Sequence, residues 1–288
     1  KKGALQFYIW GMYRRVLTIQ DISCFGQCSL TVALPIISAC GVETAVLPSA
    51  ILSTHTGGFT GWTFQDLTKE MLPISEHWRV ADIRFDAFYT GYLGSIEQIN
   101  MVKHIMDTNG VDGAIRVVDP AMADNGALYP GFNMEFVDAM KDLCAHADVL
   151  LPNMTEACML TNTEYSENID RETVELLCKK LCELGTKSVV LTGVGFRPDY
   201  TGVMLYDGKE FNYYEHKKIT KGFNGTGDCY ASAFVGAMLR GRPMVDAARI
   251  AADFVLECIE KTYEDKSHWY GVKFELALPN LIKNLADE

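Results

Sequence analysis

The chain centres on Lys221-Gly222-Phe223-Asn224-Gly225-Thr226-Gly227-Asp228-Cys229-Tyr230-Ala231-Ser232-Ala233-Phe234, a polar loop with several glycines that leads directly into an expected helix of small and apolar residues. Gly225 and Gly227 allow backbone conformations that other residues avoid. The first N–H groups of a helix have no partner within it and point outward, with the positive end of the helix dipole behind them. The stretch is therefore typical of an anion site, and phosphate is the usual occupant of such a site.

Asp228 stands in the first turn of the expected helix, beside this anion site. A carboxylate next to bound phosphate is electrostatically unfavourable if the loop only binds the anion. The same carboxylate is useful as a general base, because it can accept the proton of a hydroxyl group that attacks a phosphate. An ordinary helix with an aspartate near its N-terminus fits the stretch equally well. The loop alone does not decide between the two interpretations.

The bulk composition narrows the class of protein. A chain of 288 residues with 48% hydrophobic and 22% charged residues is typical of a globular protein with a large core. The net charge of −11 argues against nucleic acid or an anionic membrane as the main partner. The nine cysteines contain no CxxC pair, which is typical of reduced thiols. Reduced thiols are typical of a cytosolic protein, so we expect a cytoplasmic location. No apolar run is long enough to span a membrane.

Strand and helix patterns alternate along most of the chain, without a linker or a change of composition. The alternation predicts an α/β fold in which helices cover both faces of a parallel sheet. We expect one domain over residues 12–288, and residues 1–11 as an N-terminal appendage. The expected strands cover residues 16–20, 42–47, 86–90, 115–120, 149–151 and 188–192, followed by a hairpin of 202–206 and 210–216. The expected helices cover residues 29–40, 95–109 (opened by a capping box of Ser95 and Gln98), 134–145, about 174–181, 226 onward, 247–258 and 274–285.

Polar residues gather at the carboxyl ends of these expected strands, where parallel sheets bind their ligands. These ends carry Asp21, Gly91-Tyr92, Asp119, Asn153 with Glu156, and Thr192. Asp119, Asp124 and Glu156 are candidate magnesium ligands, since Mg²⁺ is usually held by one or two carboxylates together with substrate phosphates. Each acid alone is equally well explained by a turn, a solvated loop or a first helical turn. The absence of clustered His and Cys argues against zinc.

Two common nucleotide-binding motifs are absent from the chain. Gly193-Val194-Gly195 follows an expected strand, but it lacks the third glycine of the dinucleotide fingerprint, and Pro198 and Gly202 prevent a following helix. A nicotinamide-dependent oxidoreductase is therefore disfavoured. No GxxxxGK[ST] sequence occurs, which excludes a P-loop.

Taken together, these stretches resemble the ribokinase-like superfamily and, within it, the pyridoxal (vitamin B6) kinase family. The resemblance covers residues 16–258, and its most specific part is Gly225-Thr226-Gly227-Asp228. In that superfamily this signature supplies the anion hole and the catalytic base. The resemblance implies a three-layer α/β/α sandwich with a mostly parallel central sheet.

Further stretches match the B6-kinase pattern: Leu17–Gln20, Thr54–Gly57, Thr90–Ser95, Asp119-Pro120 with Asp124 and Tyr129, Pro152-Asn153-x-x-Glu156, and Val190–Thr192. The resemblance implies an ATP-dependent kinase that phosphorylates the 5′-hydroxymethyl group of pyridoxal, pyridoxamine or pyridoxine, with Asp228 as general base and Gly225, Thr226 and Gly227 as anion hole. It implies an ATP side formed by Asp119, Asn153, Glu156, Thr192, Lys221, Gly222, Phe223, Asn224, Gly225 and Gly227. It implies a magnesium side formed by Asp119, Asp124 and Glu156. It implies an alcohol side formed by Asp21, Ser23, His55, Thr56, Tyr92 and Asp228.

One departure concerns the alcohol side. Pyridoxal kinases usually carry Ser-His directly after the Ile-Gln strand, whereas this chain has Asp21-Ile22 and then Ser23. Hydroxymethylpyrimidine kinases of thiamine synthesis have Gly-Ser-Asp in this region, so such a kinase is the alternative. His55-Thr56 and Gly91–Gly94 favour a B6 vitamer.

A catalytically silent ligand-binding protein of the same fold is a third hypothesis, from a different class. It predicts a missing base or anion loop, and both are present here. The B6-kinase family is commonly dimeric, so we expect a homodimer. The sequence leaves open which vitamer is preferred and whether a monovalent cation assists.

Overall fold

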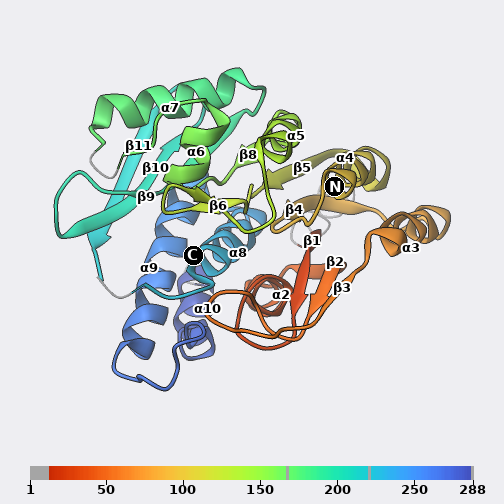
Figure 1. The fold of residues 1–288 in the computed structure, drawn as a ribbon, viewed down its shortest axis with the longest axis horizontal. Helices are drawn as coiled ribbons and strands as arrows, with labels where there is room; N and C mark the ends of the chain where they lie inside the picture. The colour runs from red at the N-terminus through yellow and green to blue at the C-terminus, as the bar shows by residue number, and fades with distance from the viewer. Residues whose placement is uncertain (1–12, 167–168, 220–221, 287–288) are drawn as a thin grey trace, which may run out of the picture.

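A nine-stranded sheet forms the centre of the computed structural model, which describes residues 13–166, 169–219 and 222–286 (Figure 1). The strand order is β11-β10-β9-β8-β5-β4-β1-β2-β3. The strands span β1 Arg15–Ser23, β2 Glu43–Leu52, β3 Phe64–Asp66, β4 Phe85–Thr90, β5 Gly110–Val118, β8 Val149–Leu150, β9 Ser188–Val194, β10 Tyr200–Tyr206 and β11 Phe211–Lys217. The run from β2 to β9 is parallel, and β3, β10 and β11 add antiparallel edges.

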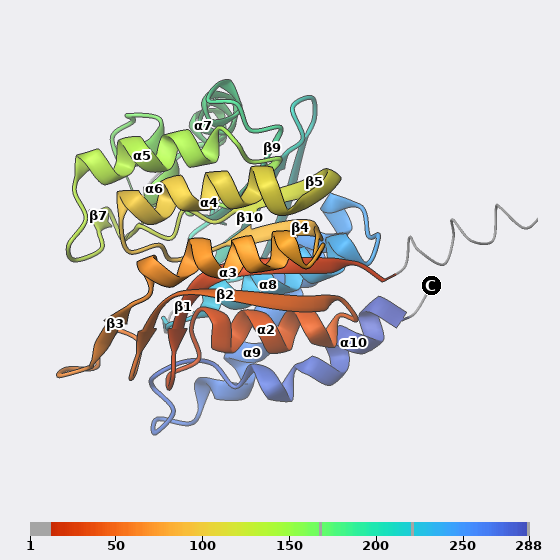
Figure 2. The same ribbon diagram turned by 90° about the vertical axis from the view of Figure 1, so that its right-hand side faces the viewer.

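Helices cover both faces of the sheet, so the fold is the expected three-layer α/β/α sandwich. Figure 2 shows α3, α4 and α5 on one side and α2, α9 and α10 on the other. The first layer comprises α3 Thr68–Val80, α4 Ile96–Asn109, α5 Met134–Cys144, α6 Met154–Leu160 and α7 Arg171–Glu183. The second comprises α2 Leu30–Ala39, α8 Thr226–Leu239, α9 Met244–Tyr263 and α10 Leu278–Ala286, with a short 3₁₀ turn, η1 Phe274–Leu276, before α10.

The central strands are buried on both faces because their apolar residues alternate between the two cores. Val16 packs into the core shared with α8, and Leu17 packs into the opposite core. Burying a side chain of this size typically stabilises the fold by about 1.5–3 kcal/mol. Small residues let α8 lie close to its neighbours: a Cβ atom on Gly236 would come within 2.5 Å of the Cys40 sulfur. The C-terminal half of α8 therefore packs closely against the end of α2.

Several predicted boundaries need correction. β1 continues through Asp21 to Ser23 instead of ending in a turn at Asp21, since Ile22 and Ser23 still pair with β2. The capping box at α4 is only half formed: Ser95 Oγ accepts from the Gln98 amide at 3.2 Å, but Gln98 Oε1 accepts from the Gly94 amide.

The predicted elements did not include α3, α6, β3 or the small hairpin of β6 Ala123–Asp124 and β7 Ala127–Leu128, which are short or weakly patterned. α3 was missed because Pro73 interrupts it and its buried positions, Thr68, Met71 and Ser75, form no continuous apolar stripe. The expected appendage, residues 1–11, lies outside the described residues. No helix in the described part of the chain is long and apolar enough to cross a membrane.

Candidate active site

The loop before α8 forms a tight, glycine-dependent entry to the helix. Gly225 is the N-cap residue and has φ +76°, a left-handed conformation that glycine adopts easily. A Cβ atom at this position would lie 2.2 Å from the carbonyl oxygen of Gln27, so only glycine fits. Gly227 differs from the expectation: it lies inside the first helical turn, and nothing is within 4 Å of the place its Cβ would take. Its role is to leave open space in front of the helix N-terminus.

Asp228 lies at this N-terminus and faces the loop that follows β1. Its Oδ2 atom accepts a hydrogen bond from the Ser29 amide at 2.9 Å. Burial raises the pKa of Asp228 to about 6, against the opposing effect of the Ser29 amide and with the help of Asp21. A carboxyl group with such a pKa is ionised at neutral pH and still basic enough to accept a proton.

Four carboxylates lie within electrostatic range of the Tyr129 side chain. Burial, followed by negative charge, raises the Tyr129 pKa, and the charges come from Glu156, Asp124, Asp119 and Asp228. The structure therefore brings these four predicted residues into one region, although they come from the ends of β5 and the β8–α6 segment, from the β6–β7 hairpin and from α8.

Besides Asp228, this region holds two partly or fully buried acids, Asp119 and Glu156. Burial, Glu156 and Asp228 hold the pKa of Asp119 well above its usual range, while burial raises that of Glu156 to about 7. Such a pair of buried acids fits a divalent cation, because a cation would relieve both the burial cost and the mutual repulsion. Within the described residues no three His, Cys, Asp or Glu side chains are grouped so as to hold a metal by themselves. A magnesium ion at this place would complete its coordination with water or with phosphate oxygen atoms.

Asn153 and Glu156 form a reciprocal capping box at the start of α6. Both side chains also bond to the segment that enters the β6–β7 hairpin. Asn153 Oδ1 accepts from the Glu156 amide at 3.0 Å, and Glu156 Oε2 accepts from the Asn153 amide at 2.9 Å. Glu156 Oε1 also accepts from the Met122 amide at 2.9 Å, and Asn153 Nδ2 donates to the Ala123 carbonyl at 2.7 Å. Both side chains thus hold the segment that leads to Asp124. The Asp124 carboxylate itself is exposed and bonded to its neighbour Asn125.

Thr192 on β9 lies beside Asn153 because the two residues form a parallel bridge just beyond the end of β8. The Thr192 amide and hydroxyl both donate to the Pro152 carbonyl, at 2.9 and 3.3 Å. The predicted nucleotide-side residues of these two strands are therefore adjacent.

Asp21, Ser23 and Tyr92 form the opposite wall. Asp21 is buried, and its Oδ2 accepts from Ser23 Oγ at 2.9 Å. Burial raises the Asp21 pKa, although bonds from Ser29 and Ser23 oppose the rise. Burial and the Asp21 charge also raise the pKa of Tyr92, so its hydroxyl lies within electrostatic range of Asp21. The Tyr92 ring stacks on Phe132 with 5.6 Å between centroids.

His55 has both ring nitrogens engaged by backbone groups. Nδ1 accepts from the Gly57 amide at 3.0 Å, so the proton lies on Nε2, which donates to the Tyr270 carbonyl at 2.7 Å. His55 therefore joins the loop after β2 to the segment before η1. Thr56, next to it, is exposed.

Asn224 connects the two sides of the site. Its Nδ2 donates to the Gly57 carbonyl at 3.2 Å, so the loop before α8 is tied to the loop that carries His55. Phe223 packs against the core shared with α8, and Gly222 is exposed with no atom near its missing Cβ. Lys221 lies outside the described residues.

Sequence reasoning missed a group of aromatic rings that cover this junction: Phe25, Phe59, Trp269 and Tyr270. The Phe59 and Trp269 centroids are 4.6 Å apart, and those of Phe25 and Tyr270 are 4.7 Å apart. Phe25 and Phe59 are more than 200 positions from Trp269 and Tyr270 in the chain, and no local pattern connects the two pairs. Their closeness follows only from the packing of three loops.

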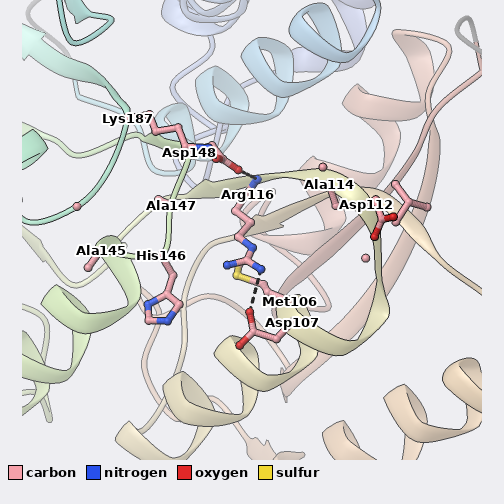
Figure 3. Close-up of a pocket in the computed structure, with 14 residues that line it drawn as sticks. Met106, Asp107, Asp112, Ala114, Arg116, Ala145, His146, Ala147, Asp148 and Lys187 are labelled. Atoms are coloured by element: carbon pink, nitrogen blue, oxygen red, sulfur yellow. Dashed lines mark hydrogen bonds and ion pairs between the residues drawn. The ribbon is translucent and has the colours of Figure 1, made fainter.

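A separate cavity of about 540 Å³ lies at the amino ends of β5, β8 and β9, on the opposite edge of the sheet. Figure 3 shows Arg116 between Asp107 and Asp148: its guanidinium bonds to Asp107 and its amide bonds to Asp148, both at 2.8 Å. Lys187 pairs with Asp148 at 2.6 Å. Because these basic groups are already paired with acids, the cavity does not compete with the α8 N-terminus as an anion site.

The glycine-dependent anion loop, the adjoining carboxylate and the three-layer sandwich define a class: the chain is a ribokinase-like kinase. The family model "Phosphomethylpyrimidine kinase" matches residues 33–272, and the chain belongs to this family. The relatives of this chain include both pyrimidine kinases and pyridoxal kinases.

Among curated relatives, a hydroxymethylpyrimidine/phosphomethylpyrimidine kinase of Bacillus subtilis is 28% identical over 256 residues, which are 88% of this chain and 84% of the relative. A protein of Bacteroides thetaiotaomicron assigned as a phosphomethylpyrimidine kinase is 34% identical. Its rhombohedral form has a TM-score of 0.90 and covers 93% of each chain, and its orthorhombic form, with pyridoxal, has a TM-score of 0.88 and covers 93% of this chain and 95% of that one. The pyridoxal kinase of Lactobacillus plantarum is 30% identical, with a TM-score of 0.87 over 94% of this chain and 97% of its own.

Proposed function

We propose that the protein is an ATP-dependent kinase of the 5′-hydroxymethyl group of pyridoxal, pyridoxamine or pyridoxine. The observation that carries the proposal is the position of the Asp228 carboxylate at the N-terminus of α8, in front of the left-handed Gly225. A phosphate at the helix N-terminus and a base beside it are the two requirements of phosphoryl transfer to an alcohol.

Asp228 accepts the proton of the alcohol as the alcohol oxygen bonds to the γ-phosphorus, while the bond from that phosphorus to the β–γ bridging oxygen breaks and ADP leaves. The amides of residues 225–228 bind the oxygens of the transferred group, and losing one such donor typically costs about 3 kcal/mol of transition-state stabilisation. When bound, Mg²⁺ supplies positive charge to the phosphates. Asp119 would hold it, either directly or through water, with Glu156 and Asp124 in support. Asn153, Thr192 and residues 221–224 line the nucleotide side.

Support for a B6 vitamer comes from the wall opposite the nucleotide. The Asp21 carboxyl is buried within electrostatic range of Tyr92, and burial raises its pKa. We propose that Asp21 bonds to the pyridine nitrogen or to the ring hydroxyl, with Ser23, Tyr92, Thr56 and the His55 loop around the ring. The pyridoxal form of the 34% identical Bacteroides protein is in line with this choice.

A hydroxymethylpyrimidine kinase is the second candidate function, favoured by the matched family and by the Bacillus relative. Turnover of pyridoxal and of hydroxymethylpyrimidine, measured side by side with ATP, separates the two. We expect kcat/KM to be higher for pyridoxal. A clear preference for the pyrimidine would overturn the B6 assignment and leave the kinase mechanism in place. If the protein binds these ligands but consumes no ATP with either alcohol, the result would instead support a catalytically silent binding protein.

The proposed base is tested by Asp228→Asn, which keeps the size of the side chain and removes its basicity. We expect kcat to fall by roughly 10²–10⁴-fold, the usual effect of losing a general base. Binding of both substrates, followed by calorimetry, should stay close to that of the wild type. A variant with nearly unchanged kcat would show that another group accepts the proton.

A further inference from the structure

The loop between β1 and α2, residues 24–29, has an unfavourable backbone conformation. Gln27 has φ +57° and Ser29 has φ +55°, both in the left-handed region. A Cβ atom makes this region costly, and neither glutamine nor serine adopts it readily. The backbone preferences of these residues do not explain the loop, so contacts with other segments must stabilise it.

The Gln27 side chain makes such contacts with the C-terminal part of the chain. Its Oε1 atom accepts a hydrogen bond from His268 Nε2 at 2.8 Å. Its Nε2 atom donates to both carboxylate oxygens of Glu275, at 2.9 and 3.1 Å. Both polar atoms of the Gln27 amide are therefore bonded, and one partner is charged, which strengthens the bond.

The segment 268–275, which carries these partners, is anchored in the protein interior. Val272 and Phe274 are buried in the core shared with α8. A Cβ atom on Gly271 would come within 2.9 Å of the Gln27 Cβ, so the segment lies directly against the loop. The anchored segment can therefore hold Gln27 in place.

The same loop makes two contacts with the start of α8. The Gln27 carbonyl oxygen lies 2.2 Å from the place that a Cβ atom on Gly225 would take. The Ser29 amide donates to Asp228 Oδ2 at 2.9 Å. Because Gln27 precedes Ser29 by only two residues, a change in the Gln27 backbone would move both contacts.

We propose that Gln27 is a positioning residue for the catalytic base. Its side-chain amide, bonded between His268 and Glu275, keeps the loop in its left-handed conformation. The loop in turn holds the Ser29 amide on the Asp228 carboxylate. Through Gln27, the segment 268–275 thus supports the base.

The inference rests on the proposed function, in which Asp228 is the general base. A reacting group displaced by about 1 Å can lose about 100-fold in rate. If the Gln27 side chain loses its partners, the loop should relax and shift the Ser29 amide away from the carboxylate. This change should lower kcat, while the sites that bind ATP and the alcohol stay formed.

The test exchanges the two partners of one hydrogen bond. Gln27→Glu keeps the shape of the side chain but sets a carboxylate against that of Glu275. We expect kcat to fall about tenfold or more, with little change in either KM. The double variant Gln27→Glu/Glu275→Gln restores an amide–carboxylate pair in the opposite direction, and its kcat should return to within about twofold of the wild type. Gln65→Glu, the same change at an exposed glutamine of β3, is the matched control and should leave kcat unchanged.

A second comparison shows whether Gln27 acts through the base. Gln27→Glu is introduced into Asp228→Asn, which has no base left to position. In that background the substitution should change kcat by less than about twofold, because the effects of residues that act as a unit are not additive. The proposal is overturned by an undiminished loss of kcat in this background, by a double variant without recovery, or by wild-type kcat in Gln27→Glu.

If the wild type phosphorylates neither alcohol, the proposed function fails, and the link from Gln27 to Asp228 can still be tested by itself. In proton–nitrogen NMR spectra, the Ser29 amide proton signal should move upfield in Gln27→Glu, because its bond to the carboxylate lengthens. The signal should return in the double variant. An unshifted Ser29 signal in Gln27→Glu would contradict the link even in an inactive protein.

Discussion

The carboxyl group of Asp228 is held away from solvent, and the Asp21 carboxylate lies near it. Its ionised form, which the proposed chemistry needs, is therefore less favourable in the folded protein than in the unfolded chain. The same burial that makes the group basic makes it costly, a conflict often found at active sites. Two measurable consequences follow, one for the rate and one for stability.

The rate should depend on pH through this group. Because the base must be ionised, kcat/KM should decrease as the pH falls below about 6, the pKa that burial gives Asp228. Rates between pH 5 and 8, with both substrates far below saturation, measure this limb. Glu156 titrates nearby, with a pKa raised to about 7. In the variant Glu156→Gln, the residual kcat/KM should still decrease below about pH 6. If the pH of this decrease changes in the variant, the decrease reports on Glu156 instead of Asp228.

Stability should depend on pH in the opposite sense. The pKa of Asp228 is about 6 in the folded protein, above the usual value of 3.8 for an aspartate. Ionisation therefore destabilises the folded form as the pH rises from 3.8 to about 6. Asp228→Asn cannot ionise. Its advantage in unfolding free energy should be small at pH 4 and grow to about 2–3 kcal/mol at pH 8, by 1.36 kcal/mol per pKa unit. Urea unfolding of both proteins at the two pH values measures it, and an advantage independent of pH would argue against the raised pKa.

At the scale of elements, the junction between the loop 222–225 and α8 is the most sensitive one, because two glycines in it serve different purposes. Gly225 provides a backbone conformation and a close contact with Gln27, whereas Gly227 provides open space at the helix N-terminus. The sequence alone suggested a single purpose, conformational freedom, for both. A matched pair of alanine variants separates them.

Gly225→Ala places a Cβ against the Gln27 carbonyl and puts alanine in a left-handed conformation, which by itself costs about 1–2 kcal/mol. We expect lower stability and a strong loss of activity, because the displaced loop carries the Ser29 amide that bonds Asp228. Gly227→Ala should be more stable than wild type by about 0.5–1 kcal/mol, since glycine is unfavourable in a helix. Its affinity for ATP should fall, because the methyl group stands where the phosphate approaches. Denaturation and nucleotide titration of both variants check this, and equal behaviour of the two would contradict it.

Much of this architecture was predictable from local patterns, for physical reasons. The alternating apolar residues of β1 and the helix ending at Gly41 depend on short-range periodicity and backbone preference, and both were found. The carboxyl ends of parallel strands must meet at one edge, so Asp119 and the Asn153–Glu156 segment were expected together before any contact was known. The engagement of His55 with Tyr270 was not predictable, because it joins loops 215 positions apart.

At the scale of the whole molecule, the two halves of the sandwich contribute different sides of the site. The end of β5, the β6–β7 hairpin and the β8–α6 junction carry the acids around Tyr129. The ends of β1 and β4, together with the loop after β2, carry the wall of Asp21, Tyr92 and His55. The N-terminus of α8 lies between these sides, and its loop reaches the second through Asn224. The homodimer and the cytoplasmic location remain predictions.

The hydrogen bond from Asn224 to the Gly57 carbonyl has a thermodynamic consequence. A ligand that orders one of these loops also restricts the other through this bond. The second substrate then loses less conformational entropy when it binds, so the two substrates should bind cooperatively. Linkage requires that ATP strengthen the binding of the alcohol by the same factor by which the alcohol strengthens that of ATP. We expect a factor of about five or more in the wild type and about one in Asn224→Ala.

Titration calorimetry with a non-hydrolysable ATP analogue and the alcohol, added in both orders, measures this factor. Independent binding in the wild type would contradict the coupling, and an unchanged factor in Asn224→Ala would assign it to other contacts. If the expected factors are found, a single amide group makes each substrate an effector of the other, and the site is fully assembled only when both substrates are bound.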